Sequence, residues 1–327
     1  MLRRRLFCQA LAGTGVTVAA IAAAQTRAKV YRLGHLTIGR ADKELLDLQR
    51  DPFVVELARL GLVEGVNIVT DVRSAHGNAA LLDAVAADLV AARPDVLYTA
   101  SGYIGARALK NATTTIPIVF AAVGEPVAAG LVASLARPGG NLTGGTVPSG
   151  LELKRVQLLM ELLGPSASIV MLTTPVAEGR MARFREELAA SRLRLQFEEV
   201  RSPEDLAPAF EHMVRQRVGG VVIAQSLLTG SHSGEIAALV VKHRLPAIGF
   251  AGDFADRGLL MSYSFDSDEL DRKAANYVYR ILNGASPAEL PVEQATKFDF
   301  VVNQKAARTL GVRIPRSVLI AATRVID

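Results

Sequence analysis

The sequence has almost no cysteine, and that shortage excludes several kinds of site. Its single cysteine, Cys8, precedes an uncharged stretch at residues 11–24. A chain cleaved after this stretch contains no cysteine, and therefore no disulfide, thiolate nucleophile or cysteine-ligated metal. Cys8 does not fit a lipoprotein attachment site either, because such a cysteine follows the apolar stretch.

Aromatic residues are also scarce. Tryptophan is absent, and aromatic residues make up only 5% of the chain. Sites that hold sugars use aromatic rings as stacking surfaces, so this composition argues against a sugar ligand.

Motifs for catalysis and cofactor binding are missing as well. No GxxxxGK[ST] phosphate loop occurs, and the loop at residues 37–42 has one glycine where a dinucleotide site needs several. The nearest match to the GxSxG elbow of serine hydrolases, residues 230–234, has His232 in place of the serine. The five histidines show no metal-ligand spacing. We therefore expect no enzymatic activity, no cofactor and no bound metal.

The N-terminus has the organisation of a secretory signal. Arg3, Arg4 and Arg5 form a positive region, the uncharged stretch at residues 11–24 follows, and small residues suited to cleavage end at Ala24 and Ala28. The stretch is shorter than the roughly 20 apolar residues of a membrane-spanning helix. We predict that residues 1–28 are removed on export to the periplasm, by the twin-arginine or the Sec route.

The basic character of the chain lies mostly in that leader. The formal net charge is +5, and four positive but no negative residues precede Lys29, which leaves +1 for the mature chain. A charge so close to zero gives no support to nucleic-acid binding.

Beyond the leader, short β-branched runs alternate with helical patterns in two series, residues 29–147 and 148–251. Repeated strand–helix units predict parallel sheets covered by helices, so we expect two Rossmann-like α/β lobes. The first lobe should also receive residues from about 252 to 284, and the second those from about 285 to 327. The lobes are then joined by several strands, with hinges near residues 144–149 and 250–252.

The segment at residues 113–144 shows its turn chemistry most clearly. We predict a buried strand over Ile116–Phe120, a helix over Ala128–Ala136 and a new strand over Leu142–Val147, separated by Gly- and Pro-containing breakers. A loop directly after a buried parallel strand is where open α/β folds bind ligands.

Together with GLVEGVNI at residues 61–68 and RPDV at residues 93–96, this segment resembles the substrate-binding proteins of ABC importers. The resemblance runs from about Val30 to the C-terminus. It is strongest to the branch with a type I periplasmic-binding fold, whose better-understood members are linked to uptake of aromatic amino acids. It implies two lobes that close on a small ligand, and an ABC permease in the inner membrane as partner. The family more often has Asp at the position of Glu125.

Polar or aromatic residues recur where predicted strands end, in both lobes, and we take these as the candidate ligand-binding residues. They are His35, Thr37, Thr99, Ser101, Gly102, Tyr103, Val123 and Glu125 in the first lobe, and Thr174, Gln225, Ser226, Phe250 and Asp253 in the second.

Two groups of these residues suggest which charges the ligand carries. Ser101 and Gly102 precede a predicted helix, so their amides are placed to bind an anionic group, although Ser101 fits a plain N-cap equally well. Glu125 or Asp253 is a candidate partner for a ligand ammonium, because a buried cation needs a compensating carboxylate. Glu125 also fits a solvated turn.

The sequence thus predicts a monomeric, exported solute-binding protein of an ABC importer. Its ligand would be an amino acid or a small carboxylate, aromatic or not, held between the lobes. The alternative is a periplasmic sensor of the same fold that reports to a membrane receptor or kinase.

Overall fold

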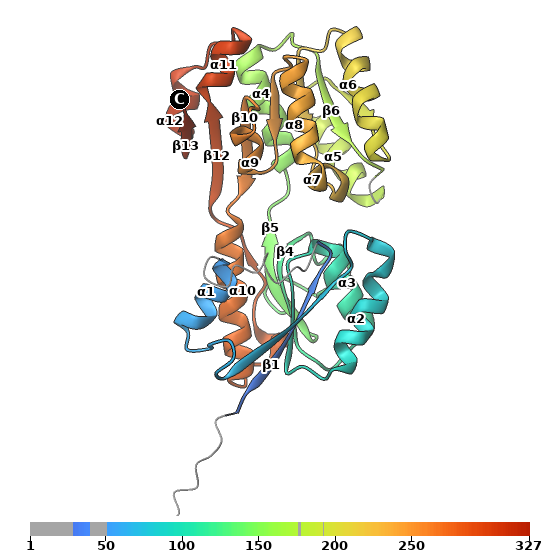
Figure 1. Cartoon of the computed structure of the whole chain (residues 1–327), viewed down its shortest axis with the longest axis vertical. Coiled ribbons are helices and arrows are strands. Elements are labelled where there is room, and N and C mark those ends of the chain that lie inside the picture. Colours follow the sequence, from blue (N-terminus) through green and yellow to red (C-terminus); the bar gives the residue numbers. More distant parts are fainter. Residues whose placement is uncertain (1–28, 40–50, 176–177, 192) are drawn as a thin grey trace, which may run out of the picture.

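The computed structural model describes residues 29–39, 51–175, 178–191 and 193–327, so the expected leader lies outside the described residues. Two sheets, each with helices on both faces, form two lobes that lie one above the other along the longest axis of the molecule (Figure 1). This arrangement confirms the predicted α/β fold with two lobes.

Lobe 1 is built on a parallel sheet with the strand order β11-β5-β4-β3-β1-β2. Its strands are β1 (Tyr31–Thr37), β2 (Ile68–Ser74), β3 (Val96–Thr99), β4 (Ile118–Gly124), β5 (Leu142–Val147) and β11 (Glu293–Gln294). One face packs on α2 (Leu82–Ala91) and α3 (Gly102–Ala112), and the other on α1 (Pro52–Arg59) and α10 (Ser267–Leu282).

Lobe 2 is built on a sheet with the order β13-β12-β10-β9-β8-β6-β7, in which only the β10–β12 pair is antiparallel among the described strands. The strands are β6 (Ile169–Thr173), β7 (Leu195–Glu199), β8 (Gly220–Ile223), β9 (Ala247–Gly249), β10 (Met261–Phe265), β12 (Phe298–Asn303) and β13 (Arg324–Ile326).

The helices of lobe 2 divide between the two faces of this sheet. One face carries α6 (Leu206–Arg215), α8 (Ser233–Lys242) and α9 (Gly252–Asp256), while α7 (Leu227–Ser231) is a short helix just before α8. The other carries α4 (Leu151–Leu163), α5 (Glu178–Ser191), α11 (Gln304–Leu310) and α12 (Arg316–Ala321).

The chain crosses between the lobes three times. The first crossing joins β5 to α4, the second joins β10 to α10 at Asp266, and the third joins β11 to β12 at residues 295–297. All three lie side by side at the waist of the molecule (Figure 1).

The expected lobe boundaries need correction in the C-terminal part. Residues 252–265 stay in lobe 2, because β10 pairs with β9 and β12. Residues up to about 296 belong to lobe 1, because β11 pairs with β5. The predicted hinge at residues 250–252 is therefore wrong, since this segment joins β9 to α9 within lobe 2. Hydropathy alone did not reveal the antiparallel partner of β10.

The predicted helix over Ala128–Ala136 is also wrong, because the structure has turns there. Gly130 lies in the left-handed region at φ +67°, which interrupts a helix after one turn. Leu131 and Val132 are nevertheless buried against the core of lobe 1. Their apolar spacing reflects burial of a compact turn.

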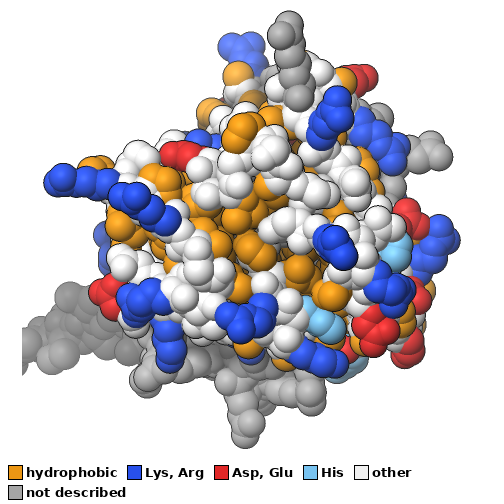
Figure 2. Space-filling model, turned by 90° about the horizontal axis from the view of Figure 1, so that it is seen from above, with side chains coloured by type: hydrophobic (Ala, Val, Ile, Leu, Met, Phe, Trp, Pro, Cys, Tyr) orange, Lys and Arg blue, Asp and Glu red, His pale blue; other side chains and the backbone are white. Residues whose placement is uncertain are grey.

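The near-zero net charge of residues 29–327 is unevenly divided between the lobes. Residues 148–265 and 298–327 contain 18 Lys and Arg against 15 Asp and Glu, or +3, while residues 29–147 and 266–297 contain 15 against 17, or −2. Figure 2 shows the far end of lobe 2, where Lys and Arg side chains surround a central group of hydrophobic ones. The molecule therefore has a basic lobe and an acidic lobe.

Candidate ligand-binding site

Strand direction brings the predicted site residues to the side of each lobe that faces the crossings. In lobe 1, β1, β3 and β4 run parallel to β5, whose carboxyl end leads into the first crossing. In lobe 2, β6, β8 and β9 run parallel to β10, which leads into the second crossing. The carboxyl ends of both sets of strands therefore lie on the interlobe side, where this class of fold binds ligands.

In lobe 1, hydrogen bonds join the loops after β1 and β3. The hydroxyl of Ser101 accepts a hydrogen bond from the Ile38 amide at 2.9 Å, and the Ser101 amide donates to Thr99 Oγ1 at 3.1 Å. Thr99 itself is fully buried. Both polar groups of Ser101 thus position the two loops, and its side chain makes no N-cap hydrogen bond to α3.

This geometry occupies one of the two amides that the sequence analysis proposed for an anionic group. The Ser101 amide already has an acceptor, whereas the first-turn amides of Gly102, Tyr103 and Ile104 have none within the described ranges. Helix first turns leave such N–H groups for a ligand or water. Gly102 has φ +60° and an added Cβ would lie 3.7 Å from the Ala122 carbonyl, so the start of α3 lies close to β4. Tyr103 is half-buried beneath the Arg107 guanidinium, 5.2 Å from its ring centre.

Glu125 follows β4 directly and is half-buried. Its φ of +51° places a non-glycine residue in the left-handed region. Arg93, Arg217 and Arg244 share this conformation, but they follow helix ends, where it is common. Strained residues that persist at a strand end often mark a functional site.

Two predicted residues of lobe 1 turn away from this group. The side chain of Val123 is completely buried in the core. His35 packs its ring 4.8 Å from that of Tyr98, on the sheet face covered by α1 and α10, and burial lowers its pKa to about 4. Both alternate with neighbours that face the other side of the sheet. Thr37 remains at the strand end, where its hydroxyl accepts from the Gly39 amide at 3.2 Å.

The lobe 2 residues lie at the ends of three neighbouring strands, β6, β8 and β9. Ser226 caps α7, because its hydroxyl accepts from the Thr229 amide at 3.1 Å. The ring of Phe250 contacts Phe254 edge-on at 5.1 Å and reaches toward Gly230 of α7. Thr174 is half-buried and Gln225 is exposed.

Asp253 is an exposed residue in the first turn of α9. Its carboxylate accepts hydrogen bonds from Arg257 at 3.2 Å and from Ser233 at 3.4 Å. The ion pair with Arg257 makes Asp253 part of the surface electrostatics of lobe 2.

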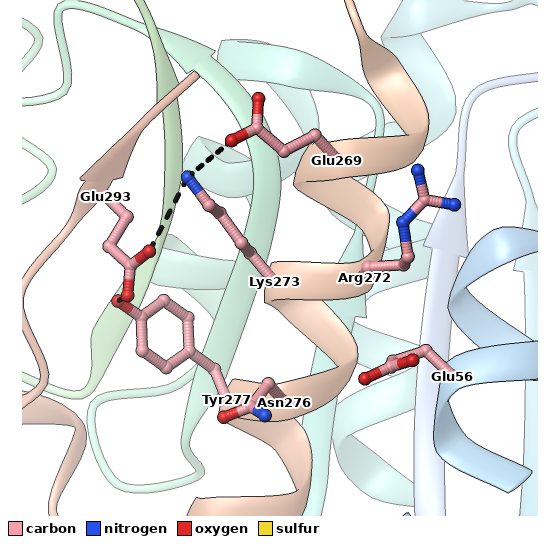
Figure 3. Close-up of a pocket in the computed structure, with 7 residues that line it drawn as sticks. All are labelled: Glu56, Glu269, Arg272, Lys273, Asn276, Tyr277 and Glu293. Carbon is pink, nitrogen blue, oxygen red and sulfur yellow. Dashed lines mark hydrogen bonds and ion pairs between the residues drawn. The ribbon is translucent and has the colours of Figure 1, made fainter. Parts of the chain in front are cut away.

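A separate open groove of about 400 Å³ lies on α10 and includes none of the predicted residues (Figure 3). Its charged groups are largely paired with one another: Lys273 lies 3.0 Å from Glu269 and 3.6 Å from Glu293, and Tyr277 donates to Glu293 at 2.8 Å. Open, internally neutralised walls do not suit an enclosed ligand site.

Sequence reasoning missed this network. Asp266 and Glu269 do indicate the start of a helix, because the Asp266 carboxylate caps α10 by accepting a hydrogen bond from the Glu269 amide. The other partners of Glu269, Thr296 and Lys297, are 27 and 28 residues further on, and no local pattern connects them.

Within the described ranges, no group of three or more His, Cys, Asp or Glu side chains is arranged to hold a metal ion. In the same part of the chain, no helix is long and apolar enough to cross a membrane.

Comparison with known proteins connects this geometry to a family. A profile of the ABC transporter substrate binding protein family matches residues 42–326. The chain belongs to this family. It is therefore a solute-binding component of an ABC importer, which binds a small ligand outside the cytoplasm and delivers it to a permease.

Three proteins are similar to this substrate-binding protein over most of its length. It is 24% identical over 271 residues to a tyrosine-binding protein of Clostridioides difficile, covering 82% of this chain and 78% of the relative. The crystal structure of a conserved domain protein of Vibrio cholerae superposes with a TM-score of 0.80 and 30% sequence identity. The match covers 91% of this chain and 100% of the other.

The third is a crystal structure of an ABC domain from Streptococcus pneumonia in complex with L-Trp. Its TM-score is 0.79 and its identity 24%, over 91% of this chain and all of the other. These neighbours confirm the type I periplasmic-binding fold expected from the sequence. The family match favours the importer over the sensor that the sequence had left open.

Proposed function

We propose that this substrate-binding protein captures an L-amino acid with an aromatic side chain, as an exported monomer without catalytic activity. The observation that carries the proposal is the start of α3, where the Gly102, Tyr103 and Ile104 amides have no acceptor among the described residues. Gly102 lies close to the carbonyl oxygen of Ala122 in β4, and Ala122 precedes Glu125 by three residues. An α-amino acid carries its carboxylate and its ammonium on the same carbon atom, so a site for it needs a partner for each within a few ångströms.

The carboxylate would bind at the positive end of α3, where first-turn amides and the helix dipole favour an anion. Glu125 would pair with the ammonium, because it follows β4, the strand whose Ala122 carbonyl lies close to Gly102. Asp253, the other carboxylate expected from the sequence, is exposed and pairs with Arg257 in lobe 2.

An aromatic side chain is supported by relatives that bind tyrosine or tryptophan. The chain supplies two aromatic residues near the interlobe side, Tyr103 in lobe 1 and Phe250 in lobe 2. Edge-on or offset contacts with such rings add to the energy of burying the ligand. Thr174, Gln225 and Ser226 would complete the site from lobe 2 when the lobes close.

The test uses the mature chain from residue 29. Mass spectrometry of ligand released from the purified protein identifies the ligand class. Calorimetry then compares L-tyrosine, L-tryptophan and L-phenylalanine with tyramine, which lacks the carboxylate, and with 4-hydroxyphenylpropionate, which lacks the ammonium. Each missing charged group is expected to weaken binding by about ten- to a hundredfold.

A matched pair of variants assigns the ammonium site. Glu125→Gln should weaken L-tyrosine binding by about ten- to a hundredfold but leave 4-hydroxyphenylpropionate binding unchanged. Glu289→Gln, an exposed carboxylate of the same lobe, should affect neither. Equal affinity of Glu125→Gln and the parent for L-tyrosine would disprove the assignment.

A further inference from the structure

The third crossing is bonded to lobe 1 along its whole length up to Lys297. β11 pairs with β5, and the Ala295 amide donates to the Thr146 carbonyl at 2.9 Å. From Phe298 onward the chain pairs with β10 of lobe 2. The change of lobe therefore falls between Lys297 and Phe298.

The Glu269 carboxylate holds the last two residues before that change. It accepts hydrogen bonds from the Thr296 amide at 3.0 Å, the Thr296 hydroxyl at 2.6 Å and the Lys297 amide at 2.8 Å. Glu269 is only 8% exposed, and it lies in the first turn of α10, directly after the second crossing. One buried carboxylate thus joins two of the three crossings.

Lys273 extends this connection along α10. Its ammonium lies 3.0 Å from Glu269 and 3.6 Å from Glu293, and donates to the Gln294 carbonyl at 3.1 Å (Figure 3). Tyr277 anchors Glu293 at 2.8 Å. The chain Thr296–Glu269–Lys273–Glu293 therefore fastens β11 and the third crossing to one face of α10.

At the change of lobe itself, one backbone hydrogen bond joins the two crossings, from the Asp266 amide to the Lys297 carbonyl at 2.9 Å. Residues on one side of this bond are held by Glu269, and residues on the other belong to the β10–β12 pair. A short segment between two rigid bodies absorbs the backbone rotation when such lobes move.

We propose that Glu269 is the positioning residue of the hinge: by fixing Thr296 and Lys297 to α10, its carboxylate confines the backbone rotation within the second and third crossings to Asp266 and the Lys297–Phe298 junction. The role rests on the proposed function, in which the lobes close on a ligand. It sets the range of opening angles of the ligand-free protein and so the entropy lost on closure.

The test needs no ligand, so its failure is distinct from failure of the proposed function. The mature chain has no cysteine, and Ala87 on α2 and Ala238 on α8 are exposed sites for a pair of spin labels, one on each lobe. Pulsed electron spin resonance gives the distribution of distances between the lobes. Hydrogen exchange reports the Thr296 and Lys297 amides in the same variants.

In Glu269→Gln, the distance distribution should broaden, and the Thr296 and Lys297 amides should exchange about ten- to a hundredfold faster, while amides in β1 and β3 keep the parent rate. Glu56→Gln is the matched control, because Glu56 lines the same groove but pairs with Arg59 of its own helix, α1. It should leave both measurements unchanged.

A parent-like distribution and parent-like exchange in Glu269→Gln would overturn the proposal, as would equal effects in Glu56→Gln. If Glu269→Gln does not fold, Thr296→Val, which removes one donor to Glu269, decides instead. It should accelerate exchange at Lys297 and broaden the distribution, and parent-like behaviour of this variant would overturn the proposal as well.

Discussion

Asp271→Asn is expected to stabilise the protein, although Asp271 makes a hydrogen bond in the native state. The Tyr98 hydroxyl donates to its carboxylate at 3.0 Å. Burial, with smaller contributions from Asp51 and Asp268, nevertheless raises the pKa of Asp271 from 3.8 to about 6. An asparagine keeps the acceptor oxygen for Tyr98 and removes the buried charge.

The pKa of Asp271 sets both the expected gain in the free energy of unfolding and the pH range over which this gain changes. The folded state holds the Asp271 proton more tightly than the unfolded state, so stability falls as pH rises from about 4 to about 6. A difference of about two pKa units corresponds to about 3 kcal/mol at neutral pH. Asp271→Asn should recover about 2–3 kcal/mol at pH 7.5 and only about 1 kcal/mol at pH 4.5.

Urea unfolding of the mature chain, followed by circular dichroism at both pH values, measures these differences. Asp268→Asn is the control, since Asp268 lies in the same helix, is 55% exposed and pairs with Arg272. It should change stability by less than about 0.5 kcal/mol. A loss of stability in Asp271→Asn at pH 7.5, or a gain independent of pH, would refute the reasoning.

Three further outcomes are expected. Glu269 shows the opposite pKa shift from Asp271: burial opposes its ionisation, but hydrogen bonds from Thr296, Lys273 and Lys297 lower its pKa to about 2. Its contribution to the free energy of unfolding is therefore present above pH 4.5 and lost toward pH 2. Glu269→Gln should lower the free energy of unfolding, measured in urea at neutral pH, by about 1.5–3 kcal/mol. Gly145→Ala should cost about 1–3 kcal/mol, because its Cβ would lie 2.3 Å from the Ala121 carbonyl oxygen, while Gly140→Ala, with nothing within 4 Å, should be tolerated. N-terminal sequencing of exported protein should begin between Gln25 and Val30; an intact Met1 in the membrane fraction would contradict cleavage.

The sequence was sufficient for the fold where each strand is buried and its neighbours are parallel. The run at Leu142–Val147 forms β5 with the predicted bounds. In such segments the hydrophobic periodicity and the Gly or Pro residues that end the strand lie within a few residues of one another, so the local sequence is enough to predict them. Lobe membership after Gly252 was not readable, because it depends on pairing between β10 and β12, more than thirty residues apart.

The candidate site shows the same division. The candidate residues after β3, β4 and β8 lie on one side of their sheets because the strands are parallel, and this placement could be predicted from the sequence. Contacts between loops that are distant in the sequence decide which polar groups of these residues can still bind a ligand. The Ser101 hydroxyl accepts a hydrogen bond from the Ile38 amide, and the side chain of Val123 faces the core.

Solution scattering of the mature chain, with and without the amino acid released from it, tests the central claim most directly. Capture between two hinged lobes predicts a smaller radius of gyration at saturation, because the lobes approach each other as they enclose the ligand. An unchanged radius of gyration, at ligand concentrations where calorimetry shows the protein to be saturated, would contradict closure of the lobes on the ligand.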